Sequence, residues 1–257
     1  MSKIATAFSN DDTVAIITLN DGKGNILDHQ MMGELQIVLD GFKILPNLKL
    51  IMFQGEGKHF SFGASVEEHK KDAAAAMLQS FHKLFYTIRE LSIPTLAKVS
   101  GQCLGGGMEL AIMCNFIFAE KNAKFGQPEI VLGVFPPPAS IILPEKIGLA
   151  RAEDLLITGR TITAAEAKTM GLVNDVAEDR DALNALVNEW IMMYIEPKSA
   201  SSLRYGVKAS RVKFNHILGN FLPMLESMYV NELMQTHDAS EGINSFIEKR
   251  VPVWESR

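Results

Sequence analysis

Short apolar runs rich in β-branched residues alternate with longer stretches whose apolar residues repeat at helical spacing. The apolar run at 13–20 ends in an Asp-Gly turn and precedes a helical stretch at 31–42. A second run at 48–53 is followed by a helical stretch at about 73–91. Strands that alternate with helices predict an α/β layered fold rather than a helical bundle or a β-sandwich.

The pattern changes after Pro197, where the sequence becomes helical and amphipathic. We expect three helices there, near residues 201–213, 217–236 and 240–249. Because the chain has 257 residues, of which 47% are hydrophobic, it can bury a full core. We predict a core domain of residues 1–197 and a helical C-terminal region of residues 198–257.

The charges and the apolar segments limit the partners of the chain. A formal net charge of −5 without a dense run of Lys or Arg disfavours nucleic acid but allows a small phosphorylated ligand. No segment is apolar over the length that crosses a bilayer, and the first residues do not resemble a signal peptide. These features predict a soluble, cytoplasmic protein without a membrane partner.

The cysteines and histidines do not form a pattern typical of a metal or nucleophile site. Cys103 and Cys114 lack a metal-ligand spacing, so we expect packed thiols rather than nucleophiles or ligands. His59, His69 and His82 are expected to lie at the surface or to have structural partners, not to act in catalysis.

A glycine-rich turn stands between a predicted strand and a predicted helix. It contains Gly105, Gly106 and Gly107 and is followed at once by Glu109. Successive glycines let the backbone approach a ligand, and a helix N-terminus adds unpaired N–H donors, so the turn can hold an anion. The spacing matches no nucleotide-phosphate motif, and alone it is more typical of a tight turn, with Glu109 as a first-turn helix carboxylate.

Two further segments attract attention by their order along the chain. Residues 59–65 form a turn of mainly small residues that contains Ala64, and residues 124–130 place Glu129 in a loop bounded by Gly and Pro. Taken singly, the first is an ordinary connection between a strand and a helix, and the second is a solvated loop.

Together these segments resemble the crotonase superfamily, the enoyl-CoA hydratases and isomerases, across essentially the whole chain. The matching segments are residues 17–20, 60–65, 101–111, 125–133 and 241–254. The resemblance implies an α/β fold, a spiral of β-β-α units followed by a helical C-terminal region that supports trimerisation. It also implies a homo-oligomer, either a trimer or a dimer of trimers.

The resemblance assigns the groups that carry out the reaction. The backbone N–H groups of Ala64 and Gly106 would form the oxyanion hole for a thioester oxygen, and Glu109 and Glu129 would be the acid/base pair. Adding water to an unsaturated thioester builds negative charge on that oxygen, where fixed donors lower the barrier. Two carboxyls in different environments can hold opposite protonation states. This chemistry requires neither a metal nor a redox cofactor.

Three further positions are matched to coenzyme A, which is part of the substrate. The resemblance implies that Lys23, Phe246 and Lys249 bind CoA, with Phe246 and Lys249 supplied either by the same chain or by a neighbouring subunit. Solvent exposure is the alternative for the two lysines.

The chain departs from the family pattern in the segments that shape the acyl pocket. Phe62 and Ser65 replace the usual residues of one segment, and Pro136 and Pro137 stand where glycines are common. We therefore predict an unusual acyl pocket at Phe62, Pro136 and Pro137. Within the family, the segments resemble hydratases of cyclic dienoyl-CoA thioesters, which implies a role in anaerobic benzoyl-CoA degradation.

Two alternatives stay open. A general short-chain enoyl-CoA hydratase or isomerase would share the acid/base pair but not the changed acyl pocket. A crotonase homologue that binds RNA or acts as a scaffold without catalysis would not need Glu109 and Glu129, and the negative net charge disfavours it.

Overall fold

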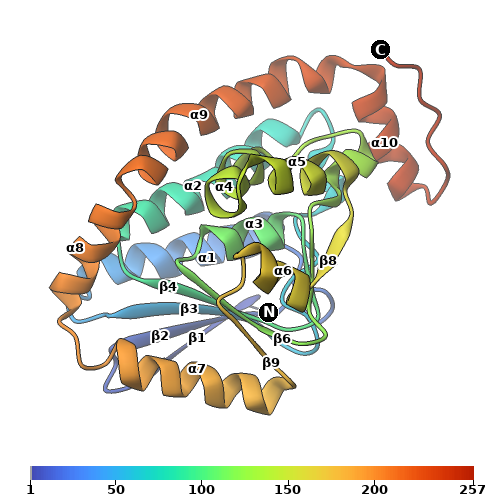
Figure 1. Ribbon diagram of the computed structural model, residues 1–257. Coiled ribbons are helices and arrows are strands. Elements are labelled where there is room, and N and C mark those ends of the chain that lie inside the picture. Colours follow the sequence, from blue (N-terminus) through green and yellow to red (C-terminus); the bar gives the residue numbers. More distant parts are fainter. Residues whose placement is uncertain (1) are drawn as a thin grey trace.

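A six-stranded sheet forms the centre of the computed structural model, which describes residues 2–257 (Figure 1). In spatial order its strands are β1 (Ile4–Ser9), β2 (Val14–Leu19), β3 (Leu50–Gly55), β4 (Thr95–Val99), β6 (Phe116–Glu120) and β9 (Asp175–Ala177). The strands are parallel except β1, which pairs antiparallel with β2. The α/β architecture predicted from the alternation is confirmed.

Helices cover both faces of this sheet. They are α1 (His29–Gly41), α2 (Ala74–Leu91), α3 (Gly106–Met113), α4 (Pro137–Ile147), α5 (Leu149–Thr158), α6 (Ala164–Met170), α7 (Arg180–Tyr194), α8 (Ala200–Ser210), α9 (Val212–Asn231) and α10 (His237–Ile247). Figure 1 shows α7 on one face and α1, α2 and α3 on the other. None of the helices within residues 2–257 is long and apolar enough to cross a membrane.

A smaller sheet lies at the end of the central one and consists of β5 (Gln102–Leu104), β7 (Lys124–Gly126) and β8 (Thr161–Thr163). The chain passes from β4 through a two-residue turn into β5 and then into α3, and it passes similarly from β6 into β7. These are the β-β-α units that the resemblance implies. Since β5 and β7 are paired, the turns that follow them lie side by side, and the N–H of Gly105 donates to the carbonyl of Gly126 at 2.9 Å.

The predicted elements agree with the structure where the apolar pattern is long. The helical stretch at 73–91 becomes α2, with ten buried residues on one face, and the run at 48–53 becomes β3. No pattern in the sequence predicted β1, helix α4 or the three-residue strands β5, β7, β8 and β9. Helix α4 begins at Pro137, and the first turn of a helix tolerates proline because its N–H groups need no helical partner.

The C-terminal helices pack directly on the core. Helix α9 lies against α2 and α4 and buries Leu218, Leu222 and Tyr229, and α10 contacts two short 3₁₀ helices, η2 (Val66–His69) and η3 (Pro128–Leu132). The prediction that α9 begins near residue 217 is wrong, since the helix begins at Val212. The domain boundary at residue 197 stays a prediction.

Candidate active site

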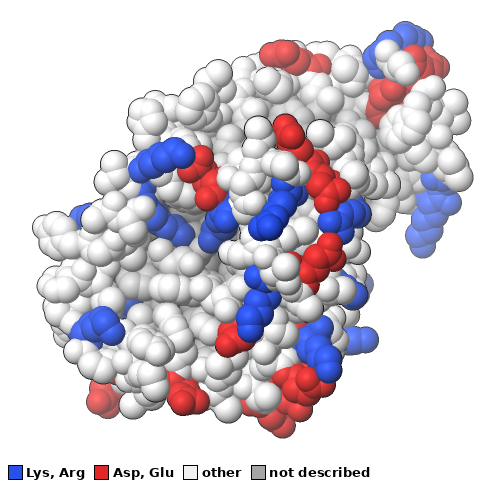
Figure 2. All heavy atoms as spheres, viewed as in Figure 1, with Lys and Arg blue, Asp and Glu red and all other residues white. Residues whose placement is uncertain are grey.

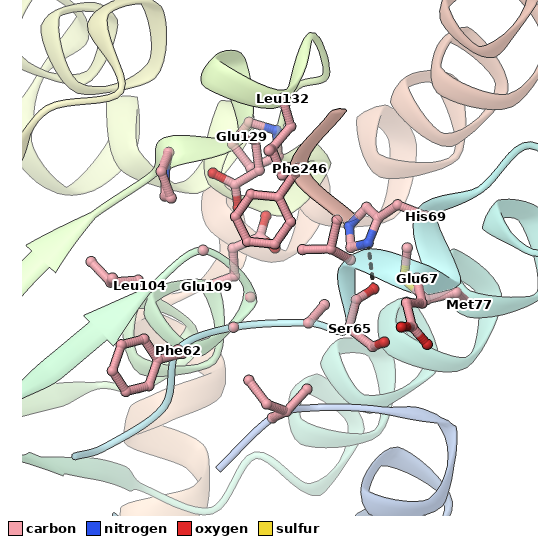
Figure 3. A pocket seen from close by; sticks show the side chains of 18 of the residues that line it. Phe62, Ser65, Glu67, His69, Met77, Leu104, Glu109, Glu129, Leu132 and Phe246 are labelled. Carbon is pink, nitrogen blue, oxygen red and sulfur yellow. Dashed lines mark hydrogen bonds between the residues drawn. The ribbon is translucent and has the colours of Figure 1, made fainter. Parts of the chain in front are cut away.

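A cavity of about 730 Å³ opens where the turns after the strands meet the C-terminal helices (Figure 3). Its walls come from the segment after β3, from α2, from the start of α3, from residues 128–137 and from α9 and α10. Most of the lining is apolar, and the polar groups converge at its base. This is the form expected of a site for a small-molecule ligand.

The backbone nitrogens of Ala64 and Gly106 belong to two neighbouring segments that line this cavity. Gly106 is the first residue of α3, and a Cβ placed on it would lie 3.1 Å from the nitrogen of Ala64. Neither N–H donates a hydrogen bond to any residue from 2 to 257. The loop before Ala64 is held by Leu27, whose N–H donates to the carbonyl of Gly63 at 2.9 Å. Two fixed, unpartnered donors are the arrangement that binds a developing oxyanion.

The glycine before this helix is required by backbone geometry and by a side chain. Gly105 has φ +50° and ψ −129°, a conformation that glycine adopts at little cost. A Cβ at this position would lie 2.8 Å from Oε1 of Glu129. Because Gly105 has no side chain, the Glu129 carboxyl can pack directly against the backbone of this turn, beside Gly106.

Glu109 lies in the first turn of α3 and is 4% exposed. Its Oε1 accepts a hydrogen bond from the N–H of Ala139 in α4 at 2.9 Å. Burial, together with the negative charge of Glu129, raises the pKa of Glu109 well above its ordinary value, although the Ala139 N–H acts in the opposite direction. The fold thus buries and orients the side chain that the resemblance assigns to the acid/base pair, and burial raises its pKa.

Glu129 reaches the same space from η3, and Figure 3 shows the two carboxyl groups extending toward one another. Burial raises the pKa of Glu129 to about 8. In the orientation that satisfies its hydrogen bonds, the amide nitrogen of Gln127 donates to both carboxyl oxygens at 3.1 Å. Because burial raises the pKa of both carboxyls and the charge of Glu129 raises that of Glu109 further, the pair is not doubly ionised near neutral pH. It can accept a proton at one position and donate one at another.

The residues predicted to shape the acyl pocket all line the cavity. Pro136 and Pro137 form its wall at the start of α4, next to the residue that holds Glu109. Phe62 is 43% exposed and packs edge-on against His59, with ring centroids 4.8 Å apart. Figure 3 shows Phe62 apart from the two carboxyls, at the edge of the cavity.

The residues predicted to bind CoA divide into two groups. Phe246 and Lys249 line the cavity of their own chain. Lys23 is exposed in the turn after β2 and does not line the cavity. The turn keeps it there because the Asp21 carboxylate accepts the N–H groups of Lys23, Asn25 and Ile26.

The histidines have structural partners, as expected. Nδ1 of His69 donates to the carbonyl of Ser65 at 2.7 Å, and His82 is fully buried against Glu226, also at 2.7 Å. His69 nevertheless lines the cavity, and burial lowers its pKa. Both cysteines are buried and unpaired, and burial raises the pKa of Cys114 to about 12. These are the packed thiols predicted from the sequence.

Tyr229 of α9 also lines the cavity, and no feature of the sequence predicted it. It is 1% exposed and its hydroxyl has no hydrogen-bond partner within residues 2–257. In the sequence it stands among methionines and leucines of an amphipathic helix, and such a position carries no local signal of a ligand.

Residues 9–257 match the family described as enoyl-CoA hydratase/isomerase. The chain belongs to this family, and it is an enzyme with the crotonase fold. Over 256 residues it is 43% identical to a cyclohexa-1,5-dienecarbonyl-CoA hydratase of Thauera aromatica, covering 100% of this chain and 98% of the relative. It is 38% identical over 250 residues to a probable enoyl-CoA hydratase of Mycobacterium bovis, covering 96% of each. An enoyl-CoA hydratase of Mycobacterium avium subsp. paratuberculosis has the same fold, with a TM-score of 0.86, 24% identity and 99% of each chain covered.

Proposed function

We propose that this enzyme hydrates cyclohexa-1,5-diene-1-carbonyl-CoA to 6-hydroxycyclohex-1-ene-1-carbonyl-CoA in anaerobic benzoyl-CoA degradation. The observation that carries the proposal is a pair of buried carboxyls beside two unpartnered N–H groups, in a cavity walled by Pro136 and Pro137. The likeness to the Thauera aromatica hydratase supports the substrate.

The reaction begins with the thioester oxygen between the N–H groups of Ala64 and Gly106. One ionised carboxylate of the pair Glu109 and Glu129 takes a proton from water, whose oxygen bonds to Cβ, and the electrons move onto the thioester as a dienolate. The two N–H donors stabilise the charge where it develops, and they need no rearrangement to do so. Burial raises the pKa of both carboxyls, so the second carboxyl of the pair can stay protonated. This carboxyl donates the proton that completes the addition.

The position of that second proton distinguishes a cyclic diene from a simple enoyl group. The dienolate extends from the thioester through Cα to the far carbon of the second alkene. Protonation at the far carbon leaves a double bond conjugated with the thioester, so the net reaction is a 1,4-addition of water. We expect Glu109 or Glu129 to donate this proton rather than His69, whose Nδ1 is bonded to Ser65.

The C-terminal region supplies the remaining parts of the proposal. We expect Phe246 and Lys249 to contact CoA, because a lysine at the cavity wall attracts phosphate. We also expect α8 and α9 to form a trimer interface, since Tyr205, Phe221 and Met224 are 71%, 44% and 61% exposed. Figure 2 shows few charged side chains over α9, and Lys and Arg interspersed with Asp and Glu elsewhere on this face, which does not favour nucleic acid.

Turnover in deuterium oxide tests the proposal. The purified enzyme is given the cyclic dienoyl-CoA, and the label is located by NMR. Deuterium at the far alkene carbon supports the proposal, whereas deuterium at Cα, or no turnover of the cyclic diene, contradicts it. The second candidate, a general enoyl-CoA hydratase, is supported by the 38% identity to the Mycobacterium bovis relative. A higher kcat/KM for crotonyl-CoA than for the cyclic diene would favour this candidate.

A further inference from the structure

Tyr229 has a buried hydroxyl for which the fold provides no partner. The side chain is 1% exposed, and its hydroxyl makes no hydrogen bond to any residue from 2 to 257. The other polar side chains at the base of the cavity are satisfied: Glu109 accepts from Ala139, and Glu129 accepts from Gln127. A buried hydroxyl without a partner is unfavourable, so its presence in a binding cavity points to a ligand.

The position of Tyr229 places this hydroxyl with the reacting groups. It lines the same cavity as Glu109 and Glu129, and its ring packs edge-on against Phe135, with centroids 5.4 Å apart. Burial raises the pKa of the phenol, and the negative charges of Glu129 and Glu109 raise it further. The phenol therefore stays neutral and can donate a hydrogen bond, but it does not act as a base.

The chemistry of the ligand limits what can accept this hydrogen bond. The acyl group of an enoyl or dienoyl thioester has one oxygen, and that oxygen is held by Ala64 and Gly106. The other oxygen that takes part in the reaction is that of the water, which becomes the hydroxyl of the product. This oxygen must lie beside the carboxyl that deprotonates it, and Tyr229 shares that region.

We propose that the hydroxyl of Tyr229 binds the oxygen added in hydration, first as the attacking water and then as the hydroxyl of the product. The inference rests on the proposed function to the extent that the enzyme adds water to a CoA thioester. The phenol donates to this oxygen, and the hydroxyl of the product can in turn donate to the ionised carboxylate. Tyr229 would therefore distinguish hydrated thioesters from those without a hydroxyl.

Tyr229→Phe tests this role because it removes the hydroxyl and keeps the ring against Phe135. We expect the KM for the hydrated thioester in the reverse reaction to rise about tenfold. The inhibition constant of the saturated thioester, which lacks the hydroxyl, should not change. The unfolding temperature of the free enzyme should stay the same or rise, because the hydroxyl has no partner to lose. Tyr194→Phe, at a 50% exposed position in α7 and away from the expected trimer interface, is the matched control and should change none of these values.

Two results would overturn the inference. Equal weakening of the hydrated and the saturated thioesters, or a lower unfolding temperature, would show that Tyr229 is structural. The measurements are made with the cyclic thioesters and with 3-hydroxybutyryl-CoA and butyryl-CoA. If the enzyme acts only on the four-carbon pair, the cyclic substrate is wrong, but the comparison of Tyr229→Phe with the wild type still decides the role of the hydroxyl.

Discussion

The β-β-α core and the C-terminal helical region contribute to one cavity in different ways. In the core, backbone bonds hold the reacting groups, as in the bond from Ala139 to Glu109 and the bond from Leu27 to Gly63. The C-terminal region contributes Tyr229, without a hydroxyl partner, and Phe246, which is 56% exposed. The core groups are thus held in place by the fold, while the hydroxyl of Tyr229 has no hydrogen-bond partner within residues 2–257 and Phe246 is largely open to solvent. Changes in the core should affect kcat, and changes in the C-terminal region should affect binding.

The largest effect is expected from the two carboxyls of the core. Glu109→Gln and Glu129→Gln keep the size of the side chain but prevent proton transfer, so each should lower kcat by about 10² to 10⁴-fold. Affinity for the CoA ester should change little. Steady-state kinetics and equilibrium binding check the two expectations separately. Glu67→Gln is the control, because Glu67 lines the cavity but is exposed in η2. Near-normal kcat in either variant would make that residue structural.

The next effect concerns the donors of the oxyanion hole. Gly106→Pro removes one N–H at the first position of α3, where proline is compatible with a helix, and kcat should fall by about 10² to 10³-fold. Gly106→Ala adds a Cβ 3.1 Å from the nitrogen of Ala64 but keeps the N–H. The difference in kcat between the two variants measures the donor alone. If the alanine variant loses as much activity as the proline variant, crowding rather than the missing N–H is the cause.

A smaller effect, on stability, follows from the buried carboxyls. The pKa of Glu129 is raised from 4.5 to about 8, so the folded state binds more protons than the unfolded state between these values. The stabilising contribution is fully present below pH 4.5 and is lost as the pH rises through 8. The free energy of unfolding should fall over this window by at most about 1.4 kcal/mol per pH unit for this group. Denaturant titrations across the window should show a flatter profile for Glu129→Gln, and an unchanged slope would contradict the assignment.

The smallest effect is expected in the C-terminal region. Lys249→Gln should weaken CoA-ester binding by a few-fold, more at low salt than at high salt, because the charge lies at the cavity wall and is partly screened. Calorimetry at two ionic strengths is a suitable measurement. Lys23→Gln is the matched control, since Lys23 is exposed and does not line the cavity. A larger loss of affinity with Lys23→Gln than with Lys249→Gln would indicate that the CoA phosphates bind near Lys23 instead.

Several parts of the fold and site could be predicted because their signals are local. The periodicity of residues 73–91 indicates a helix with one buried face, and α2 has that face. The turn at Gly105 shows in the sequence because only a residue without Cβ suits both its φ of +50° and the approach of Glu129. The resemblance added the pairing of Glu109 with Glu129, which neither residue indicates by itself.

Other features depend on distant parts of the chain, and no local pattern predicts them. Strand β1 forms because it pairs with β2. Most of its residues are exposed, so its sequence shows little apolar pattern. Lys23 matches a family position, yet the hydrogen bonds of Asp21 hold its turn outside the cavity lining. Phe62 lines the cavity at its edge, and its role in the acyl pocket stays a prediction.

By itself the sequence determined the α/β class and the glycine turn, because periodicity and backbone freedom depend on neighbouring residues. The order of its motifs, through the family resemblance, supplied Glu109 and Glu129 as the proposed acid/base pair. Only the tertiary structure decided that Ala139 orients Glu109, that burial raises the pKa of Glu129, and that Tyr229 presents an unpartnered hydroxyl 100 positions further along the chain. Burial and hydrogen bonding depend on how segments far apart in the chain pack together, and that packing has no local signal.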